Sequence, residues 1–392
     1  MKTIIITLLM LFAGITLNAQ TSINSVLASI EENNTTLKSL RESAEAEKLD
    51  NKTGIYLENP EAGFNYLWGN PTDIGNRTDF SVIQTFDIPT ITGMKSRMAG
   101  EKNNLVEWQY KADRMNILLE AKQYCIELIY YNALKEELAL RLQHAETIAA
   151  GYKERLDRGD ANILEYNKVR LNLSTVQGEI SRVDVERNAL IEQLNRLNGG
   201  NDVFLDDRLF PEIEFPLSFE SWYAEAEQKN PVLAYVKQEI EVSKKQVSLS
   251  KAMGLPTFSA GYMSEKVVGQ RYQGISVGIS IPLWANKNRV KQAQAAVRAA
   301  ESKETDSKRR FYGQLQILYN RTLGLKGTAD TYRNSLETAN SSDLLKKALD
   351  AGEISLLDYI LEIGLYYNTV NQALEAERDY QKAYAGLSAA EL

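Results

Sequence analysis

The chain has 392 residues, 44% of them hydrophobic, and a formal net charge of −7. Because the charge is negative and no long basic run occurs, nucleic acid is not an expected partner. The sequence has one cysteine, Cys125, and one histidine, His144. They leave no intrachain disulfide and no thiolate or histidine cluster for a metal. We expect His144 to be an ordinary surface residue.

The first residues have the pattern of an export signal. Lys2 precedes an apolar run over residues 4–15, and a small-residue cleavage site follows at Ala19. A dozen apolar residues are too few to span a bilayer as a helix. We therefore expect residues 1–19 to be a removed signal peptide. No cysteine follows this site, so a lipid anchor there is not supported, and no later segment has the pattern of a transmembrane helix.

The positions of the prolines predict very long helices. Residues 21–53 have a helical pattern. None of the eight prolines falls between 89 and 211 or after 282. In the first proline-free stretch a helix is expected from about 94 to 157, a length of roughly 95 Å. The helix that returns keeps a coiled-coil 4-3 spacing with one polar interruption, at Val169, Leu173, Val176, Ile180, Val183, Arg187, Leu190, Leu194 and Leu197.

Two other segments alternate between apolar and polar residues. Residues 62–68 with 80–88, and 257–262 with 275–281, are predicted to form two β-hairpins, each with one apolar face. Strands of about ten residues with one apolar face are typical of outer-membrane barrels. Four strands cannot close on themselves and an open edge cannot face lipid, so three chains would share twelve strands. The alternative is a small soluble sheet capped by helices.

One eleven-residue stretch occurs twice, at 156–166 and 349–359. We expect Gly159 and Gly352 to adopt positive φ and to end a helix. The next helix is expected to be capped by Asn162 or Ser355, with a carboxylate at the capping-box position. The recurrence at a fixed offset indicates an internal duplication. The predicted organisation is a first repeat over 20–198, a connector over 199–217 and a second repeat over 218–392.

With these elements placed, the chain resembles the TolC family of outer-membrane efflux channels over nearly all of its mature length. The resemblance rests on the Asn-Pro-x-Leu helix start at Asn230, the Ile-Pro-Leu-Trp segment at 281–284 with Lys287 and Arg289 after it, the Leu-Asn-Gly end of the first repeat at 197–199, and the two glycine-containing tips.

The resemblance implies a mainly α fold with a small β part. Duplicated long helical hairpins would form a periplasmic α-barrel, and four strands per chain would contribute to a shared trimeric 12-stranded outer-membrane β-barrel. It further implies a homotrimer in contact with outer-membrane lipid. The trimer would be coupled through a periplasmic adaptor, or membrane fusion protein, to an inner-membrane pump of the resistance-nodulation-division type.

The resemblance also implies two functional regions at the tips. Glu165 and Asp358 match the acidic positions of the family's narrow periplasmic gate, and Leu361 stands where the family has a second gate carboxylate. A looser or more apolar constriction is therefore expected. Alternatively, both carboxylates are simply helix N-terminal acids favoured by the dipole. The adaptor is expected to dock on Gly159, Asp160, Ala161, Asn162, Ile163 and Leu164, and on Gly352, Glu353, Ile354, Ser355, Leu356 and Leu357.

The function predicted from these features is that of an exit duct. It would passively conduct substrate from a tripartite efflux pump to the exterior. An outer-membrane component of type I protein secretion is an alternative within the family, and an exported coiled-coil scaffold is an alternative of a different class. No catalytic set, metal site or cofactor site is expected, and the Gly-rich segment 269–274 lacks the Lys-Ser/Thr ending of a phosphate loop. An enzyme is therefore not expected.

Overall fold

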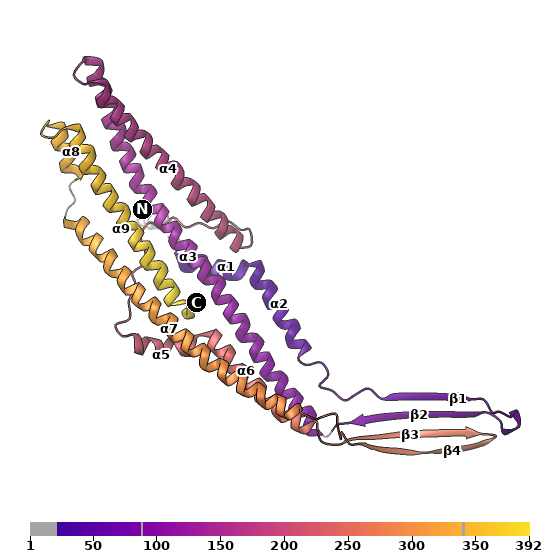
Figure 1. Ribbon diagram of the computed structural model, residues 1–392. Helices are drawn as coiled ribbons and strands as arrows, with labels where there is room; N and C mark the ends of the chain where they lie inside the picture. The colour runs from indigo at the N-terminus through magenta and orange to yellow at the C-terminus, as the bar shows by residue number, and fades with distance from the viewer. Residues whose placement is uncertain (1–21, 88, 339–341) are drawn as a thin grey trace, which may run out of the picture.

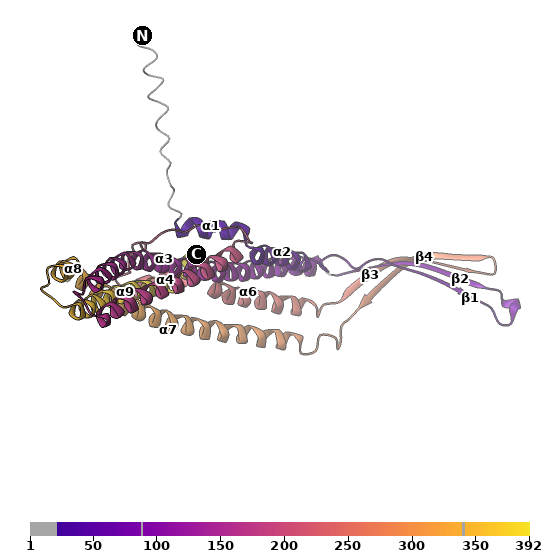
Figure 2. The same cartoon turned by 90° about the horizontal axis from the view of Figure 1, so that it is seen from above.

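The structure is a computed structural model that describes residues 22–87, 89–338 and 342–392. Long helices lie side by side over most of its length, and a β-sheet extends from one end (Figures 1 and 2). Among these residues, no helix has both the length and the apolar character needed to cross a bilayer. The expected signal peptide, residues 1–19, lies outside the described residues.

The first long hairpin is formed by α3 (Pro89–Arg158) and α4 (Ile163–Leu197). Helix α3 has 70 residues and a length of about 105 Å. It begins five residues before the expected start, because a proline fits the first helical position, where no N–H is needed. Helix α4 packs back along α3, and none of its nine seam residues is exposed. The predicted coiled-coil seam is therefore confirmed.

The second hairpin repeats this arrangement with different packing. It consists of α7 (Arg289–Thr338), α8 (Ser342–Asp350) and α9 (Leu356–Leu387), and a short 3-10 helix, η2 (Ala389–Glu391), follows. The buried seam of α9 includes Ala376, Tyr380 and Leu387, in place of the branched aliphatic residues of α4. The two hairpins are held together mainly where α3 meets α9.

Each repeat begins with two short helices instead of one. In the first repeat α1 (Ile23–Asn33) and α2 (Thr35–Asp50) are separated at Asn34, so the single helix expected over 21–53 is wrong. Asn34 has extended backbone, and its side chain accepts a hydrogen bond from the Leu37 amide at 2.8 Å. Asn230 separates α5 (Phe219–Lys229) from α6 (Pro231–Ala252) in the same way. An asparagine cap therefore marks the same break in both repeats.

The sheet contains four antiparallel strands in the order β1-β2-β3-β4. They are β1 (Glu61–Leu67), β2 (Arg77–Phe86), β3 (Thr257–Val267) and β4 (Gln270–Ser280), with a short helix, η1 (Thr72–Ile74), in the first loop. Both predicted hairpins are confirmed. The structure adds the pairing of β2 with β3, which joins the two repeats. Strands β1 and β4 are the outer strands of this sheet.

The main core lies at the middle of the molecule, where α1, α3, α4 and the connector meet. Ile30, Cys125 and Leu194 are fully buried there, and Val203 and Leu205 of the connector cover them. Burial raises the pKa of the Cys125 thiol to about 12, so the thiol stays protonated at neutral pH. The cysteine therefore acts as a small apolar core residue.

Candidate functional site

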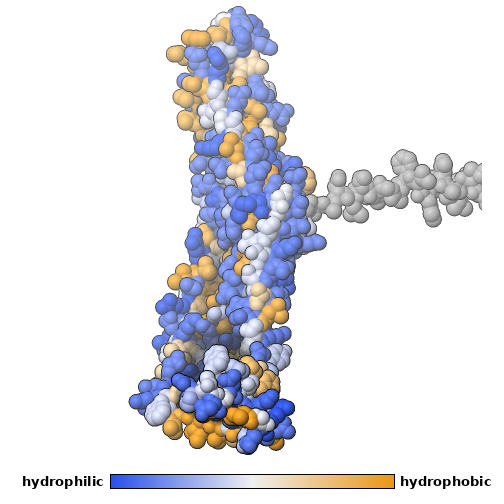
Figure 3. All heavy atoms as spheres, turned by 90° about the vertical axis from the view of Figure 1, so that its right-hand side faces the viewer, coloured by the Kyte–Doolittle hydropathy of each residue, from blue (hydrophilic) through white to orange (hydrophobic). Residues whose placement is uncertain are grey.

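One face of the sheet carries most of its large apolar side chains, and these are open to solvent. Strand register places its residues side by side: Val82, for example, pairs with Ala62 on one side and with Tyr262 on the other. The exposed large side chains of this face are Phe64, Tyr66, Phe80, Val82, Phe86, Phe258, Tyr262, Ile275, Val277 and Ile279. Figure 3, which looks at the sheet end, shows hydrophobic residues gathered along its lower side. A soluble monomer rarely exposes so large an apolar surface.

The opposite face of the sheet is polar. Arg77 lies there with its Nε 2.8 Å from Asp79 and 3.3 Å from Glu265. Serines and glycines occupy most of the remaining positions on this face of β3 and β4. The sheet thus has one side suited to lipid and one side suited to water, as in strands of a transmembrane barrel.

The first hairpin tip is a tightly hydrogen-bonded turn. Gly159 has φ 82°, its amide donates to Leu156, and the Asp160 amide donates to Arg155. These two bonds form a Schellman motif that ends α3. Asn162 then caps α4 in a reciprocal capping box with Glu165, with both bonds 2.9 Å long. The predicted positive φ and capping box are confirmed here.

The second tip has the same construction. Gly352 has φ 73°, its amide donates to Leu349, and the Glu353 amide donates to Ala348. Ser355 caps α9 in a capping box with Asp358, whose carboxylate also accepts the serine hydroxyl at 2.6 Å. The duplicated sequence therefore folds into two matching turns.

The predicted docking residues differ in their exposure. Leu164 is 68% exposed, and Ile163 and Leu357 are about half exposed. Leu356, in contrast, is buried against Tyr152 of α3 and Val169 of α4. In this arrangement Leu356 joins the two hairpins near their tips and offers no surface to a partner.

The predicted gate residues come from the two tips, Glu165 from the first and Asp358 and Leu361 from the second. Glu165 is half-buried, Asp358 is exposed, and each carboxylate is engaged in its own capping box. Leu361 is 63% exposed one helical turn after Asp358. The role of these residues as helix caps is thus directly visible. Their role at a gate depends on how the chains assemble.

A buried arginine links the two hairpins halfway along their length. Arg141 of α3 is only 3% exposed and donates to the Asn371 side chain at 2.9 Å and to the Tyr367 carbonyl at 3.2 Å. Its guanidinium also lies over the Tyr367 ring, 4.4 Å from the centroid. Burial is the main cause that raises the pKa of the Tyr367 hydroxyl.

His144 belongs to the same link, so the expectation of an ordinary surface histidine is wrong. It is half-buried, and its Nδ1 lies 3.1 Å from the Tyr367 hydroxyl. The sequence contained a signal for this contact. Arg141 occupies a core position in the 4-3-4 series Leu134, Leu138, Arg141, Ala145, where an unpaired charge would be costly.

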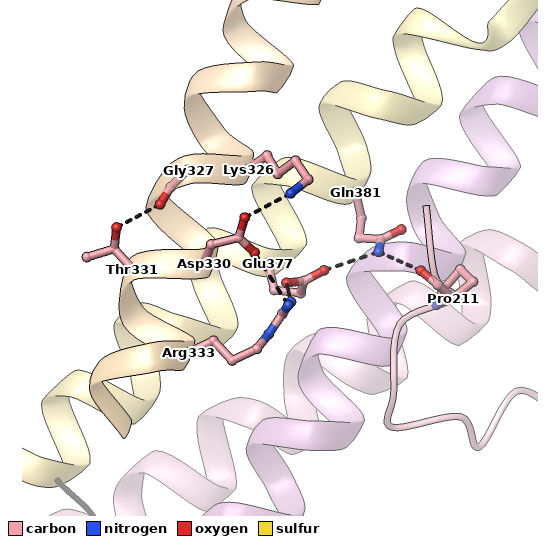
Figure 4. A network of polar contacts seen from close by, with 8 residues as sticks. All are labelled: Pro211, Lys326, Gly327, Asp330, Thr331, Arg333, Glu377 and Gln381. Atoms are coloured by element: carbon pink, nitrogen blue, oxygen red, sulfur yellow. Dashed lines mark hydrogen bonds and ion pairs between the residues drawn. The ribbon is translucent and has the colours of Figure 1, made fainter. Parts of the chain in front are cut away.

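A second polar network joins α7, α9 and the connector (Figure 4). Arg333 donates to Glu377 at 2.7 Å, and Gln381 donates to both Glu377 and the Pro211 carbonyl, at 3.2 and 2.9 Å. These bonds fix the connector against the second hairpin. Within the described ranges, no three His, Cys, Asp or Glu side chains are grouped closely enough to hold a metal ion.

Comparison with known proteins identifies a family for the second half of the chain. Residues 222–390 match the family profile described as outer membrane efflux protein. The alkaline protease secretion protein AprF of Pseudomonas aeruginosa is 26% identical over 238 residues. That match covers 56% of this chain and 49% of AprF, so it spans about half the length of this curated relative.

Solved structures extend the likeness to nearly the whole chain. The CmeC outer membrane channel of Campylobacter jejuni matches with a TM-score of 0.73 and 16% identity, over 94% of this chain and 85% of CmeC. The outer membrane protein VceC of Vibrio cholerae matches with a TM-score of 0.71 and 12% identity, over 94% of this chain and 95% of VceC. The open MtrE channel of Neisseria gonorrhoeae gives a TM-score of 0.70 at 12% identity, with 94% and 88% covered.

At these identities the structural likeness shows the fold. It is the fold expected from the sequence, with duplicated helical hairpins and four strands per chain. The family profile matches the second repeat, and the structural similarity to CmeC also includes the first repeat. Residues 222–390 therefore match the outer membrane efflux protein family, and the chain as a whole has the fold of the CmeC outer membrane channel.

Proposed function

We propose that this protein is the exit duct of an export system. Three chains would close a twelve-stranded barrel in the outer membrane, and their helical hairpins would form a tunnel into the periplasm. The duct conducts substrate passively from an inner-membrane pump and its periplasmic adaptor to the exterior. The observation that carries this proposal is the open four-stranded sheet whose exposed face is apolar.

The open edges of the sheet support the trimer. One edge of β1 and one edge of β4 have no neighbouring strand in the described structure, so their backbone N–H and C=O groups lack ladder partners. Each such group costs several kcal/mol in hydrocarbon. Pairing β4 of one chain with β1 of the next removes every free edge when three chains meet. The same closure puts all the apolar faces toward lipid and the Arg77–Asp79–Glu265 faces toward a lumen.

The cargo has two candidate classes. We propose efflux of small substrates through a tripartite pump, in line with the family described as outer membrane efflux proteins. The name of AprF, an alkaline protease secretion protein, favours type I protein secretion as the second candidate. A coiled-coil scaffold does not account for the apolar face, and failure to partition into the outer membrane would favour it.

The proposal assigns two roles to the hairpin tips. The adaptor docks on the exposed residues of the two turns, among which Ile163, Leu164 and Leu357 present apolar surface. Glu165, Asp358 and Leu361 line the narrow end of the tunnel. Because the carboxylates are held in their capping boxes, their positions are set by the helix ends and do not depend on the neighbouring chains.

The assembly is tested on the full chain purified from the outer membrane in mild detergent. Native mass spectrometry and crosslinking should give a trimer, and planar bilayers containing it should show discrete conductance steps. As a matched comparison, a variant that places proline in the ladder of an edge strand, Val277→Pro in β4, should lose both the trimer and the conductance. A stable, correctly inserted monomer would contradict the shared barrel.

The cargo is tested by deleting the gene and restoring it on a plasmid. An efflux role predicts that the deletion strain becomes more sensitive to toxic small molecules, with an unchanged set of secreted proteins. A secretion role predicts the reverse: one or more proteins disappear from the medium, and sensitivity is unchanged. Restoration by the wild-type gene is the control for both outcomes.

A further inference from the structure

Two cations stand opposite each other on the apolar face of the sheet. Lys266 of β3 pairs directly with Arg271 of β4, and Thr78 of β2 is their neighbour in the same row. Both cations are exposed. Like charges directly opposite in an antiparallel pair destabilise the sheet unless something neutralises them.

The sheet itself supplies no counter-ion on this face. Its three carboxylates, Glu61, Asp79 and Glu265, all lie on the polar side, and Arg77 pairs with the last two. Among the described residues, neither Lys266 nor Arg271 forms an ion pair. An ion-pair partner for the two cations would therefore come from outside the described residues.

Their position is the distal boundary of the apolar face. From Phe258 to Lys266, β3 runs eight residues, or about 27 Å. With the usual strand tilt this is a height of about 20 Å, close to that of the apolar band of an outer-membrane barrel. The hairpin turns at Val268 and Gly269 just beyond, at the end farthest from the helices (Figure 1).

Aromatic side chains mark the same level. Tyr66 of β1 lies in the same row of the sheet as Lys266, and Trp68, 79% exposed, follows it with ring centroids 5.4 Å apart. Tyrosine and tryptophan gather where hydrocarbon meets lipid headgroups. The two cations therefore stand at headgroup level on the exterior side of the membrane.

We propose that Lys266 and Arg271 together bind a phosphate group of a lipid headgroup in the outer leaflet. The inference rests on the membrane orientation of the proposed function. The Arg271 Nε donates to the Ser264 hydroxyl at 3.2 Å, which holds the guanidinium beside β3 and leaves its terminal N–H groups available. Arginine suits bidentate contact with phosphate, and lysine adds a point charge. The three-fold assembly gives three such sites around the barrel.

The test is native mass spectrometry of the intact trimer in detergent, titrated with bis-phosphorylated lipid A. Up to three lipids per trimer should remain bound to the wild type. In the Lys266→Gln/Arg271→Gln variant the affinity should fall at least tenfold, which corresponds to about 1.4 kcal/mol. The matched control is Lys291→Gln/Arg298→Gln, which removes the same charges from exposed positions on α7 and should bind like the wild type.

Two further arms identify the ligand. Lipid A without phosphates should bind the wild type as weakly as phosphorylated lipid A binds the double variant; equal binding of both lipids would mean that the apolar face alone holds them. Inorganic phosphate at the lipid concentration should not displace the lipid, and displacement would assign the site to free phosphate. Trimer mass and conductance are recorded on the same samples, so failure of the barrel is distinguished from failure of the lipid site.

Discussion

Gly159 and Gly352 are needed for the backbone conformation of the two turns and not for close packing. Both have positive φ, and an added Cβ at either position would meet no atom within 4 Å. Any penalty for alanine therefore comes from the backbone alone. This separates the turn glycines from Gly151, which also has open space around it but lies inside α3.

We predict opposite effects of alanine at these positions. Gly159→Ala should destabilise the tip by about 1–2 kcal/mol, because an L-residue resists the left-handed region. Gly151→Ala should stabilise the same helix by about 0.5–1 kcal/mol. Amide hydrogen exchange over residues 150–170 measures both changes locally, and Gly159→Asn, which tolerates positive φ, is the control. Effects of the same sign would mean that the turn conformation is not what the glycine provides.

Between elements, a charged pair ties α1 to the long helix. Arg114 of α3 donates to both carboxylate oxygens of Glu31, each at 2.7 Å. The hydrogen bonds from Arg114 lower the pKa of Glu31 below its ordinary value of 4.5. Because the folded-state pKa is depressed, the pair contributes its full stability above pH 4.5. That contribution is lost as the pH falls through the lowered pKa.

The pH dependence of this pair is testable. Glu31→Gln should lower the thermal midpoint of helix unfolding at pH 7, since Arg114 loses a charged partner. The difference from wild type should shrink as the pH falls below about 4.5, where the wild-type carboxylate also becomes protonated. Glu32→Gln, at the exposed neighbouring position, is the control and should be neutral throughout. A difference that stays constant down to pH 3 would exclude the ion pair as its cause.

The sequence predicted the elements well where one local pattern dominates. Alternation located both hairpins of the sheet, and the heptad spacing located the seam of α4. The break at Asn34 was missed because the helical pattern continues through it, and only the asparagine cap reveals it. The pairing of β2 with β3 and the contact of Arg141 with Asn371 join residues far apart in the chain. No local period encodes such contacts.

For the whole molecule, the tips predict ion selectivity. In the proposed trimer, three chains around one pore would bring together six carboxylates, Glu165 and Asp358 of each chain. If they face the lumen, the ring concentrates cations and repels anions. The Glu165→Gln/Asp358→Asn variant removes the charge and keeps an oxygen that can accept the capping-box bond. It therefore separates a charge effect from a helix-cap effect.

Single-channel reversal potentials under a salt gradient test this prediction. The wild-type channel should prefer cations, and the variant should lose part of that preference while its trimer remains stable. Glu42→Gln/Asp50→Asn, which removes the same charges from exposed positions on α2, should leave the reversal potential unchanged. Equal permeability ratios in wild type and tip variant would mean that the carboxylates point away from the pore and act only as caps.

In the proposed trimer, the open edges of β1 and β4 also determine the order of assembly. The helical hairpins have their cores within one chain and can fold before the chains assemble. The sheet cannot complete its ladder until two other chains arrive, so barrel closure is an association reaction whose rate depends on protein concentration. Until then the side chains of Phe64, Ile275 and Val277 remain exposed to water on each unassembled chain. Their exposed fractions are 67%, 84% and 78%. An overproduced chain is therefore most prone to aggregate as a monomer whose helices have folded but whose sheet edges are still unpaired.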